Sequence, residues 1–263
     1  MLVDSHCHLD FNSFDADRYQ VLARAREAGV TKILIPGIDL DSSRAVVALA
    51  RSEAPVYAAL GVHPNEANSW QSDTIDRLRT LSTAEKVIAV GEIGLDYYRD
   101  RAPVGLQRQV FQAQLALASE LGKPVVVHNR QATEDILEIL LEWQRSLAYA
   151  GSPLAERPGV LHSYSDSLEH AQEVIAHNFY VGFTGPITFR NALELQRVAA
   201  SLPLEHILVE TDAPFLTPHP YRGRRNEPAY VRLVVEKIAE LHQIEFTQAA
   251  SITSANASRL FQW

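Results

Sequence analysis

The chain has 263 residues, a hydrophobic fraction of 46% and a net charge of −8. No apolar run approaches the roughly 20 residues of a membrane-spanning helix, and no basic segment precedes an apolar stretch at the N-terminus, as in a signal peptide; a cytoplasmic monomer is therefore expected. The charge excludes the overall basic footprint typical of nucleic-acid binders, and the single cysteine, Cys7, excludes an intrachain disulfide. With no linker-like stretch, residues 1–263 are predicted to form a single domain.

Short β-type runs recur along the chain and alternate with amphipathic stretches of helical spacing. The expected strands are Leu2–Ser5, Lys32–Pro36, Val56–Val62, Val87–Glu92, Pro124–His128, Gly159–His162, Phe179–Phe183 and Ile207–Glu210. These runs are continuously apolar, which is typical of parallel strands buried on both faces. The expected helices include Ala16–Ala28, Ser43–Arg51, Val104–Leu121, Thr133–Leu147, Ser167–His177, Ala192–Ala199, Glu227–His242 and Thr247–Phe261.

Local signals mark several helix ends. Residue types that cap helix N-termini stand at Asp41, Ser72, Thr133 and Ser167. Glycines suited to a left-handed helix end stand at Gly29 and Gly122. The alternation of strand and helix predicts an α/β fold of the (β/α)8 TIM-barrel type. An open doubly wound sheet is the alternative, but it predicts a glycine-rich phosphate loop near the first strand, and the chain has no GxGxxG or Walker sequence.

The first expected strand ends in two histidines, His6 and His8. Residues two apart on an extended chain face the same side, so both imidazoles can be aimed at one metal ion. The same alternation points Cys7 away from them. We therefore interpret Cys7 as a small buried core residue.

Ligand-type residues recur where later strands end. In a (β/α)8 barrel these ends surround the C-terminal opening, here called the mouth, where active sites lie. The segments are Gly61-Val62-His63-Pro64, Gly91-Glu92-Ile93-Gly94-Leu95-Asp96, Val127-His128, Leu161-His162 and Glu210-Thr211-Asp212. A lone histidine or aspartate at such a position is usually a capping or solvent-facing group, but chance does not account for a set spread over six strands. The nitrogen and oxygen ligands of this set suit Zn, Mn or Mg.

The ordered motifs resemble the successive signatures of the TatD-type metal-dependent deoxyribonucleases. The segments that resemble them are Asp4-Ser5-His6-Cys7-His8-Leu9-Asp10, Gly61-Val62-His63-Pro64, Gly91-Glu92-Ile93-Gly94-Leu95-Asp96-Tyr97, Pro124-Val125-Val126-Val127-His128, Leu161-His162-Ser163-Tyr164-Ser165, Glu210-Thr211-Asp212-Ala213-Pro214-Phe215-Leu216 and Arg222-Gly223-Arg224-Arg225-Asn226-Glu227-Pro228-Ala229. They span nearly the whole chain. The resemblance implies a barrel of the metal-dependent hydrolase type with divalent metals at the mouth.

By position, the resemblance also implies a ligand set. It assigns one metal to His6, His8, Glu92 and Asp212, and a second to Glu92, His128 and His162. Glu92 is the expected bridge, because a carboxylate can share its two oxygens between two cations. We expect two divalent ions, although the resemblance is compatible with a site of two or of three metals. Asp10 and Asp96 follow ligand motifs and are interpreted as hydrogen-bond partners of the histidines or as loop caps.

The expected mechanism is hydrolysis of a phosphodiester. Two metals about 3.5–4 Å apart can activate a water and stabilise the attacking and leaving oxygens. Glu92 and Asp212 are the expected catalytic carboxylates, with Asp212 orienting the water and accepting its proton as well as binding metal. His63, in the turn between Gly61 and Pro64, is expected to contact a phosphate oxygen or the leaving group. A structural role at the strand end is the alternative for His63.

Positive charge near the mouth is local. Arg130 follows His128, and the run Arg222–Arg225 follows the eighth strand, so Arg130 and Arg225 are expected to bind substrate phosphates. Aromatic residues that could stack on unpaired bases, or simply pack against the mouth, are Tyr97, Tyr98, Tyr164 and Phe215.

The leading functional hypothesis is a metal-dependent deoxyribonuclease that acts on single-stranded DNA or on 3′ ends. Its 3′–5′ exonuclease polarity is implied by the resemblance alone. One alternative retains the metal site but hydrolyses an ester or amide, as a D-aminoacyl-tRNA deacylase does, and the charge of −8 is compatible with it. Another is a barrel that binds metal or a partner without turnover, which the complete ligand set disfavours.

Overall fold

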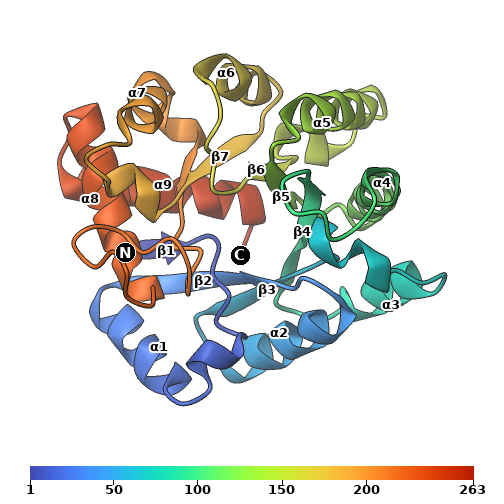
Figure 1. Ribbon diagram of the computed structural model, residues 1–263, viewed down its shortest axis with the longest axis horizontal. Coiled ribbons are helices and arrows are strands. Elements are labelled where there is room, and N and C mark those ends of the chain that lie inside the picture. Colours follow the sequence, from blue (N-terminus) through green and yellow to red (C-terminus); the bar gives the residue numbers. More distant parts are fainter.

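Eight parallel strands form a barrel in the computed structural model, which describes residues 1–263. The strands pair in chain order from β1 to β8, and helices surround them (Figure 1). Their bounds are β1 (Leu2–Asp4), β2 (Val30–Pro36), β3 (Val56–Leu60), β4 (Val87–Asp96), β5 (Val125–Arg130), β6 (Gly159–Leu161), β7 (Tyr180–Phe183) and β8 (Ile207–Val209). The predicted TIM barrel is confirmed.

The helices follow the strands around the outside of the barrel. Their bounds are α1 (Arg18–Glu27), α2 (Leu40–Ser52), α3 (Thr74–Leu81), α4 (Val104–Leu121), α5 (Thr133–Tyr149), α6 (Leu168–Ala176), α7 (Leu193–Ser201), α8 (Val231–His242) and α9 (Phe246–Phe261). Of these, α3 was not among the expected helices. No helix combines the length and apolar character needed to cross a bilayer.

Several helix ends differ from their prediction. Helix α2 begins at Leu40, because the carboxylate of Asp39 accepts a hydrogen bond from the Ser42 amide at 2.7 Å and the Ser42 hydroxyl returns one to the Asp39 amide at 2.9 Å. This capping box displaces the predicted cap, Asp41, into the first turn. The N-cap of α3 is Asp73, where Ser72 was predicted, and the N-cap of α5 is Ala132, where Thr133 was predicted. The predicted ends at Ser167 and Gly122 are confirmed.

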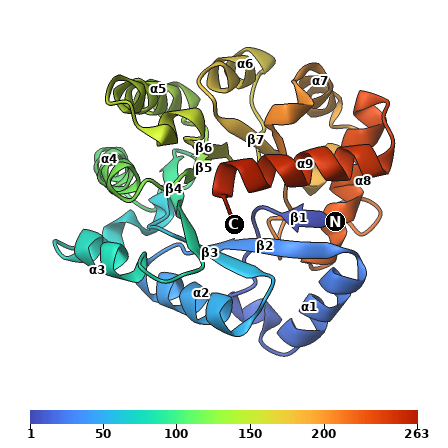
Figure 2. The same ribbon diagram turned by 180° about the vertical axis from the view of Figure 1, so that it is seen from behind.

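The interior of the barrel is filled by one buried residue from each strand. These residues are Val3, Leu34, Ala59, Ala89, Val126, Val160, Tyr180 and Leu208. They form one cluster with Ala257, Leu260 and Phe261 of α9. Figure 2 shows α9 lying across this end of the barrel. The barrel is therefore packed and covered at one end, and functional groups are left to the opposite end, the mouth.

The first and last strands meet through hydrogen bonds that continue past their ends. The Ser5 amide donates to the Val209 carbonyl at 3.2 Å, and the Asp212 amide donates to the His6 carbonyl at 2.9 Å. Between them, the buried carboxyl of Asp4 accepts from the Thr211 amide at 2.9 Å, and burial raises its pKa to about 8. This seam, defined as the β1–β8 junction, brings residues from the two ends of the chain together.

Candidate metal centre

The six predicted metal ligands converge at the mouth. Each lies in the second half of a strand or in the segment just after it, so the barrel directs all of them toward one region. His6 and His8 follow β1, Glu92 lies in β4, His128 lies in β5, His162 follows β6 and Asp212 follows β8. Most of this set is buried, with His6 fully so and Glu92 only 3% exposed.

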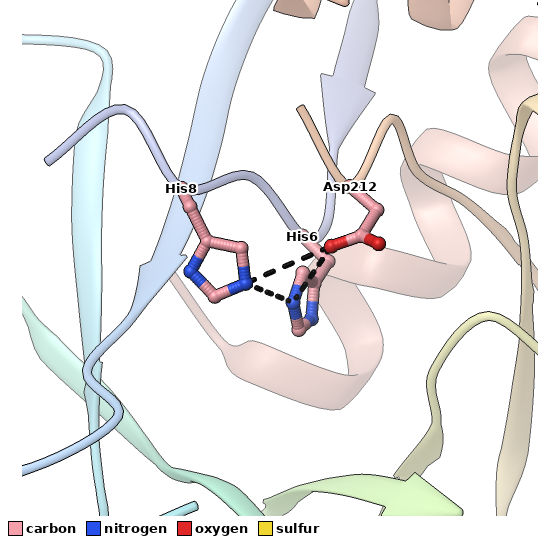
Figure 3. A group of neighbouring side chains, drawn as sticks. All are labelled: His6, His8 and Asp212. Atoms are coloured by element: carbon pink, nitrogen blue, oxygen red, sulfur yellow. Dashed lines mark hydrogen bonds and ion pairs between the residues drawn. The ribbon is translucent and has the colours of Figure 1, made fainter. Parts of the chain in front are cut away.

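The first group of ligands lies across the seam. The Nε2 atoms of His6 and His8 are 3.2 Å apart, and each lies 3.6 Å from Oδ1 of Asp212. Figure 3 shows the two imidazoles and the carboxylate directed toward one another. Asp212 has a left-handed backbone, with φ at 54°, which aspartate tolerates better than most residues. The spacing expected from His-x-His therefore converges on one point.

Glu92 stands between the two groups of ligands, with one carboxylate oxygen toward each. Its Oε2 is 3.4 Å from Nε2 of His6 and 3.5 Å from Nε2 of His8. Its Oε1 is 2.9 Å from Nδ1 of His128 and 2.9 Å from Nε2 of His162. This is the arrangement that a bridging carboxylate requires.

The electrostatics of the centre favour an ionised Glu92. Burial acts to raise the pKa of its carboxyl, but the imidazoles of His162, His63 and His6 outweigh burial and hold the pKa well below its ordinary value. Burial lowers the pKa of His6 in turn. Against the lowering effect of burial, nearby carboxylates, Glu92 among them, raise the pKa of His8, His128 and His162. Because a metal binds the neutral ring, metal binding should release protons from these imidazoles.

These residues fit divalent cations. Two buried ring nitrogens face each other at 3.2 Å, with carboxylate oxygens 3.4–3.6 Å away. A cation with ligand distances of about 2.0–2.2 Å separates neighbouring ligands by roughly 2.8–3.6 Å in octahedral or tetrahedral geometry. Mutual distances of this size, among nitrogen and oxygen donors only, are those of a set arranged around an ion.

His128 is oriented by a second carboxylate, on Asp96. Its Nε2 lies 3.2 Å from Oδ2 of Asp96, which leaves Nδ1 directed at Glu92. Asp96 is fixed by the amides of Tyr98 and Arg99, at 3.1 and 2.9 Å. A carboxylate on the outer nitrogen of a ligand histidine sets its tautomer and raises its basicity.

Asp10 does not take the equivalent position. Its Oδ1 is buried without a hydrogen-bond partner, and burial raises the pKa of its carboxyl. Cys7 is fully buried, with its thiol 3.8 Å from the Ala213 carbonyl, as expected of a core residue outside the chemistry.

His63 faces the same centre but differs from the ligands in its hydrogen bonding. Its Nδ1 accepts from the Asn65 backbone amide at 3.0 Å, and its Nε2 lies 3.5 Å from Oε1 of Glu92. Burial lowers the pKa of His63, which favours the neutral ring. Because Nδ1 is an acceptor, the neutral ring carries its proton on Nε2. His63 therefore presents an N–H donor to the mouth.

Arg130 borders a cavity of about 370 Å³ beside His162. The residues that line it include Asn129, Gln131, Ser163 and Asp166, so the cavity is largely polar. The guanidinium of Arg130 lies 4.2 Å from the centre of the Tyr98 ring. A charged and exposed group thus stands next to the ligand His162.

Arg225 forms an ion pair with Asp17, which is not one of the candidate metal ligands. Its Nη1 and Nη2 bind the carboxylate of Asp17 at 2.9 and 2.6 Å, and its guanidinium lies 4.6 Å from the Phe14 ring. These contacts join the loop after β8 to the loop after β1. The expected role of Arg225 in binding substrate stays a prediction.

The aromatic residues near the mouth divide into two kinds. Tyr164 is buried and its hydroxyl donates to the Ser167 carbonyl at 2.6 Å, while the Tyr97 hydroxyl bonds to Asp135. Tyr98 and Phe215 remain exposed, at 57% and 52%. Tyr164 and Tyr97 therefore pack against the mouth, whereas Tyr98 and Phe215 are accessible to a substrate.

Two residues at the centre were not anticipated from the sequence. Asn65 orients His63, and its side-chain amide also donates to Asp96 at 3.1 Å. Phe11 stacks on His8, with 4.7 Å between ring centres. In the sequence, only their closeness to candidate site residues could have indicated them. Asn65 stands two residues after His63, and Phe11 stands three residues after His8.

The fold and the centre define a metal-dependent hydrolase barrel. A family model described as TatD related DNase matches residues 3–262. The chain belongs to the TatD family, as its motifs suggested.

Individual relatives are similar along their whole length. An uncharacterized metal-dependent hydrolase of Bacillus subtilis, YabD, is 42% identical over 100% of this chain and 99% of that protein. The 3′-5′ ssDNA/RNA exonuclease TatD of Cronobacter sakazakii is 35% identical over 99% of this chain and 97% of that protein. The crystal structure of YjjV, a TatD homolog from Escherichia coli, matches with a TM-score of 0.91 at 32% identity, covering 100% of this chain and 98% of that one.

Proposed function

We propose that this hydrolase is a two-metal nuclease that removes nucleotides from the 3′ end of single-stranded DNA. The observation that carries the proposal is that the two carboxylate oxygens of Glu92 face different pairs of histidines. Its Oε2 faces His6 and His8, and its Oε1 faces His128 and His162. The relative from Cronobacter sakazakii, named a 3′-5′ ssDNA/RNA exonuclease, supports the choice of substrate and polarity.

The ligand set divides into two sites that share Glu92. In this proposal the first site comprises His6, His8, Glu92 and Asp212, and the second comprises Glu92, His128 and His162. His63 also lies close enough to Glu92 and His128 to bind a metal, and its hydrogen bond to the Asn65 amide is the reason it is assigned to the substrate instead. A pair of divalent cations, of Mg, Mn or Zn, supplies charge that acidifies an attacking water and neutralises the phosphate. The protein residues bind the cations, orient the substrate and move protons.

Asp212 is the proposed acceptor of the proton from water. Burial raises its pKa to about 6 in the metal-free chain, and the positive charge of a neighbouring cation would hold the carboxylate ionised. Its Oδ1 faces His6 and His8. The other oxygen of Asp212 is left to orient the water for attack in line with the leaving group.

His63 is the proposed donor to the phosphate. Its Nε2–H faces Oε1 of Glu92 at 3.5 Å, too long for a strong hydrogen bond, so the proton is available to a non-bridging or leaving oxygen. Arg130 would bind the next phosphate, because its exposed guanidinium borders the cavity beside His162. Both contacts act locally in a chain with a net charge of −8.

The test uses purified protein loaded with Mn²⁺ and a single-stranded oligodeoxynucleotide labelled at its 5′ end. The expected product is a ladder that shortens from the 3′ end, stops with EDTA and is absent with Glu92→Ala. Blocking the 3′ end with an inverted nucleotide should prevent digestion. A ladder from the 5′ end would overturn the polarity. Intact DNA together with hydrolysis of a D-aminoacyl ester would replace the nuclease by the ester hydrolase.

A further inference from the structure

We infer that Phe11 and Phe215 form a platform on which an unpaired nucleobase stacks beside the first metal site. The inference rests on the proposed nuclease function and assigns a binding site for one base of its substrate. It also explains a preference for single strands, because bases inside a duplex do not expose their faces.

The platform is continuous with the metal ligands. The Phe11 ring stacks on the imidazole of His8, with 4.7 Å between centres and 19° between planes. The Phe215 ring meets Phe11 edge to face, at 6.0 Å and 75°. Phe215 is 52% exposed and the adjacent Leu216 is 38% exposed. An exposed aromatic surface thus begins one ring away from a metal ligand.

The exposed ring stands on a fixed backbone. The Phe215 amide donates to the Asp212 carbonyl at 2.8 Å. The buried side chain of Asn226 donates to the Phe215 carbonyl at 2.6 Å, and the Asn226 amide donates to the Pro214 carbonyl at 3.1 Å. Phe215 is therefore exposed on an ordered segment. Because this segment is already fixed, binding a base to the ring would cost little conformational entropy.

Charge on the segment that follows Phe215 in the chain indicates which occupant fits. Arg222 lies over the Phe189 ring at 4.4 Å and Arg224 over the Tyr221 ring at 5.7 Å; both are exposed and neither pairs with a carboxylate. The hydroxyl of Thr217 donates to the Arg224 carbonyl at 2.6 Å, which ties this basic segment to the one that carries Phe215. Aromatic faces among unpaired cations match the alternating bases and phosphates of a single strand.

The experiment compares four oligonucleotides of the same length. One has ordinary bases and the others carry a single abasic residue at the last, second or third position from the 3′ end. In the wild type, kcat/KM is expected to fall at one of these positions. Phe215→Ala should raise KM for the ordinary strand by roughly 5- to 150-fold, the range for loss of one stacked base. It should also reduce the ratio of ordinary to abasic kcat/KM toward one.

Matched variants separate stacking from packing. Phe11→Leu retains apolar contact with His8 but removes the ring, so it should reduce the same ratio while metal content stays at the wild-type level. Tyr149→Ala removes a 97% exposed ring at the end of α5 and should preserve the ratio. Equal losses on ordinary and abasic strands in Phe215→Ala would overturn the platform.

A second measurement does not depend on turnover. A 3′-terminal 2-aminopurine should change its fluorescence on stopped-flow mixing with wild-type protein, before cleavage, and the change should be lost in Phe215→Ala. A fluorescence change without cleavage would support the platform and overturn the nuclease. Cleavage without any change at this position or its two neighbours would overturn the platform alone, and the absence of both would overturn both.

Discussion

The Nε2 atom of His128 lies 3.2 Å from Oδ2 of Asp96, while the Nδ1 atom of the same ring faces Glu92 at 2.9 Å. The ring therefore connects two carboxylates. Asp96→Asn should remove the outer charge and lower metal affinity at the second site by roughly 10- to 100-fold, with the first site nearly unchanged. Calorimetric titration of the two sites checks this. Asp15→Asn, at an exposed position, is the control, and equal affinities in Asp96→Asn and wild type would contradict the assignment.

Glu92→Gln tests the shared bridge. The amide retains only one oxygen with ligand character, so it cannot serve both groups of histidines. We expect metal content, measured by mass spectrometry, to fall below two ions per chain. Turnover should fall by at least roughly 10²–10³-fold, as on removal of a charge-stabilising group. Normal turnover with normal metal content would exclude Glu92 as the bridge.

His63→Ala tests whether His63 donates a hydrogen bond to a substrate phosphate or binds a metal. The Nδ1 bond to the Asn65 amide leaves Nε2 protonated, so loss of the ring should leave metal content intact. The value of kcat/KM should fall by roughly 10²–10³-fold, as for other donors to a developing charge. His177→Ala, at the end of α6, serves as the control. Loss of metal from His63→Ala would make His63 a ligand.

Chelation should destabilise the fold as well as stop turnover. A cation that binds only the folded chain at about 100 times its dissociation constant adds about 2.7 kcal/mol. For a chain of this size each kcal/mol corresponds to about 2–4 °C in Tm, so EDTA should lower Tm by about 5–10 °C. Thermal unfolding followed by circular dichroism measures the shift. Glu92→Gln should show a smaller one, and an unchanged wild-type Tm would mean that the ions contribute nothing to stability.

Gly94→Ala should disturb the backbone that carries His128. Gly94 has a φ of 139°, and a Cβ there would lie 2.0 Å from the His128 carbonyl oxygen. The strands must separate to admit it, so unfolding in urea should show a loss of about 1–3 kcal/mol. Gly105→Ala, in α4, meets nothing within 4 Å and should be neutral or stabilising by up to about 1 kcal/mol. Equal stability of the two variants would contradict the steric argument.

The sequence predicted the barrel because buried parallel strands leave a strong local signal. Each continuous apolar run became a strand within a few residues of its expected bounds. The strand ends also predicted which histidines and carboxylates converge at the mouth, since register fixes which residues reach it. Only the cap residue Ser72 indicated helix α3, and its extent was not predicted, because the helix is only eight residues long and buries just Thr74 and Leu78.

Relationships between distant segments were beyond the sequence. Nothing local indicates that Asp17 neutralises Arg225, 208 residues away, or that Phe11 meets Phe215. The tautomer of His63 depends on one backbone amide that the turn directs at its ring. Such contacts arise from packing between loops, whose conformation is not encoded by periodicity.

Because the proposed first metal site lies across the seam between β1 and β8, it could form only late in protein synthesis. His6 emerges from the ribosome almost at once, but Asp212 follows only after seven more strands. Until then Glu92, His128 and His162 can offer at most the second site. Occupancy of the proposed first site would therefore require that both ends of the chain have joined.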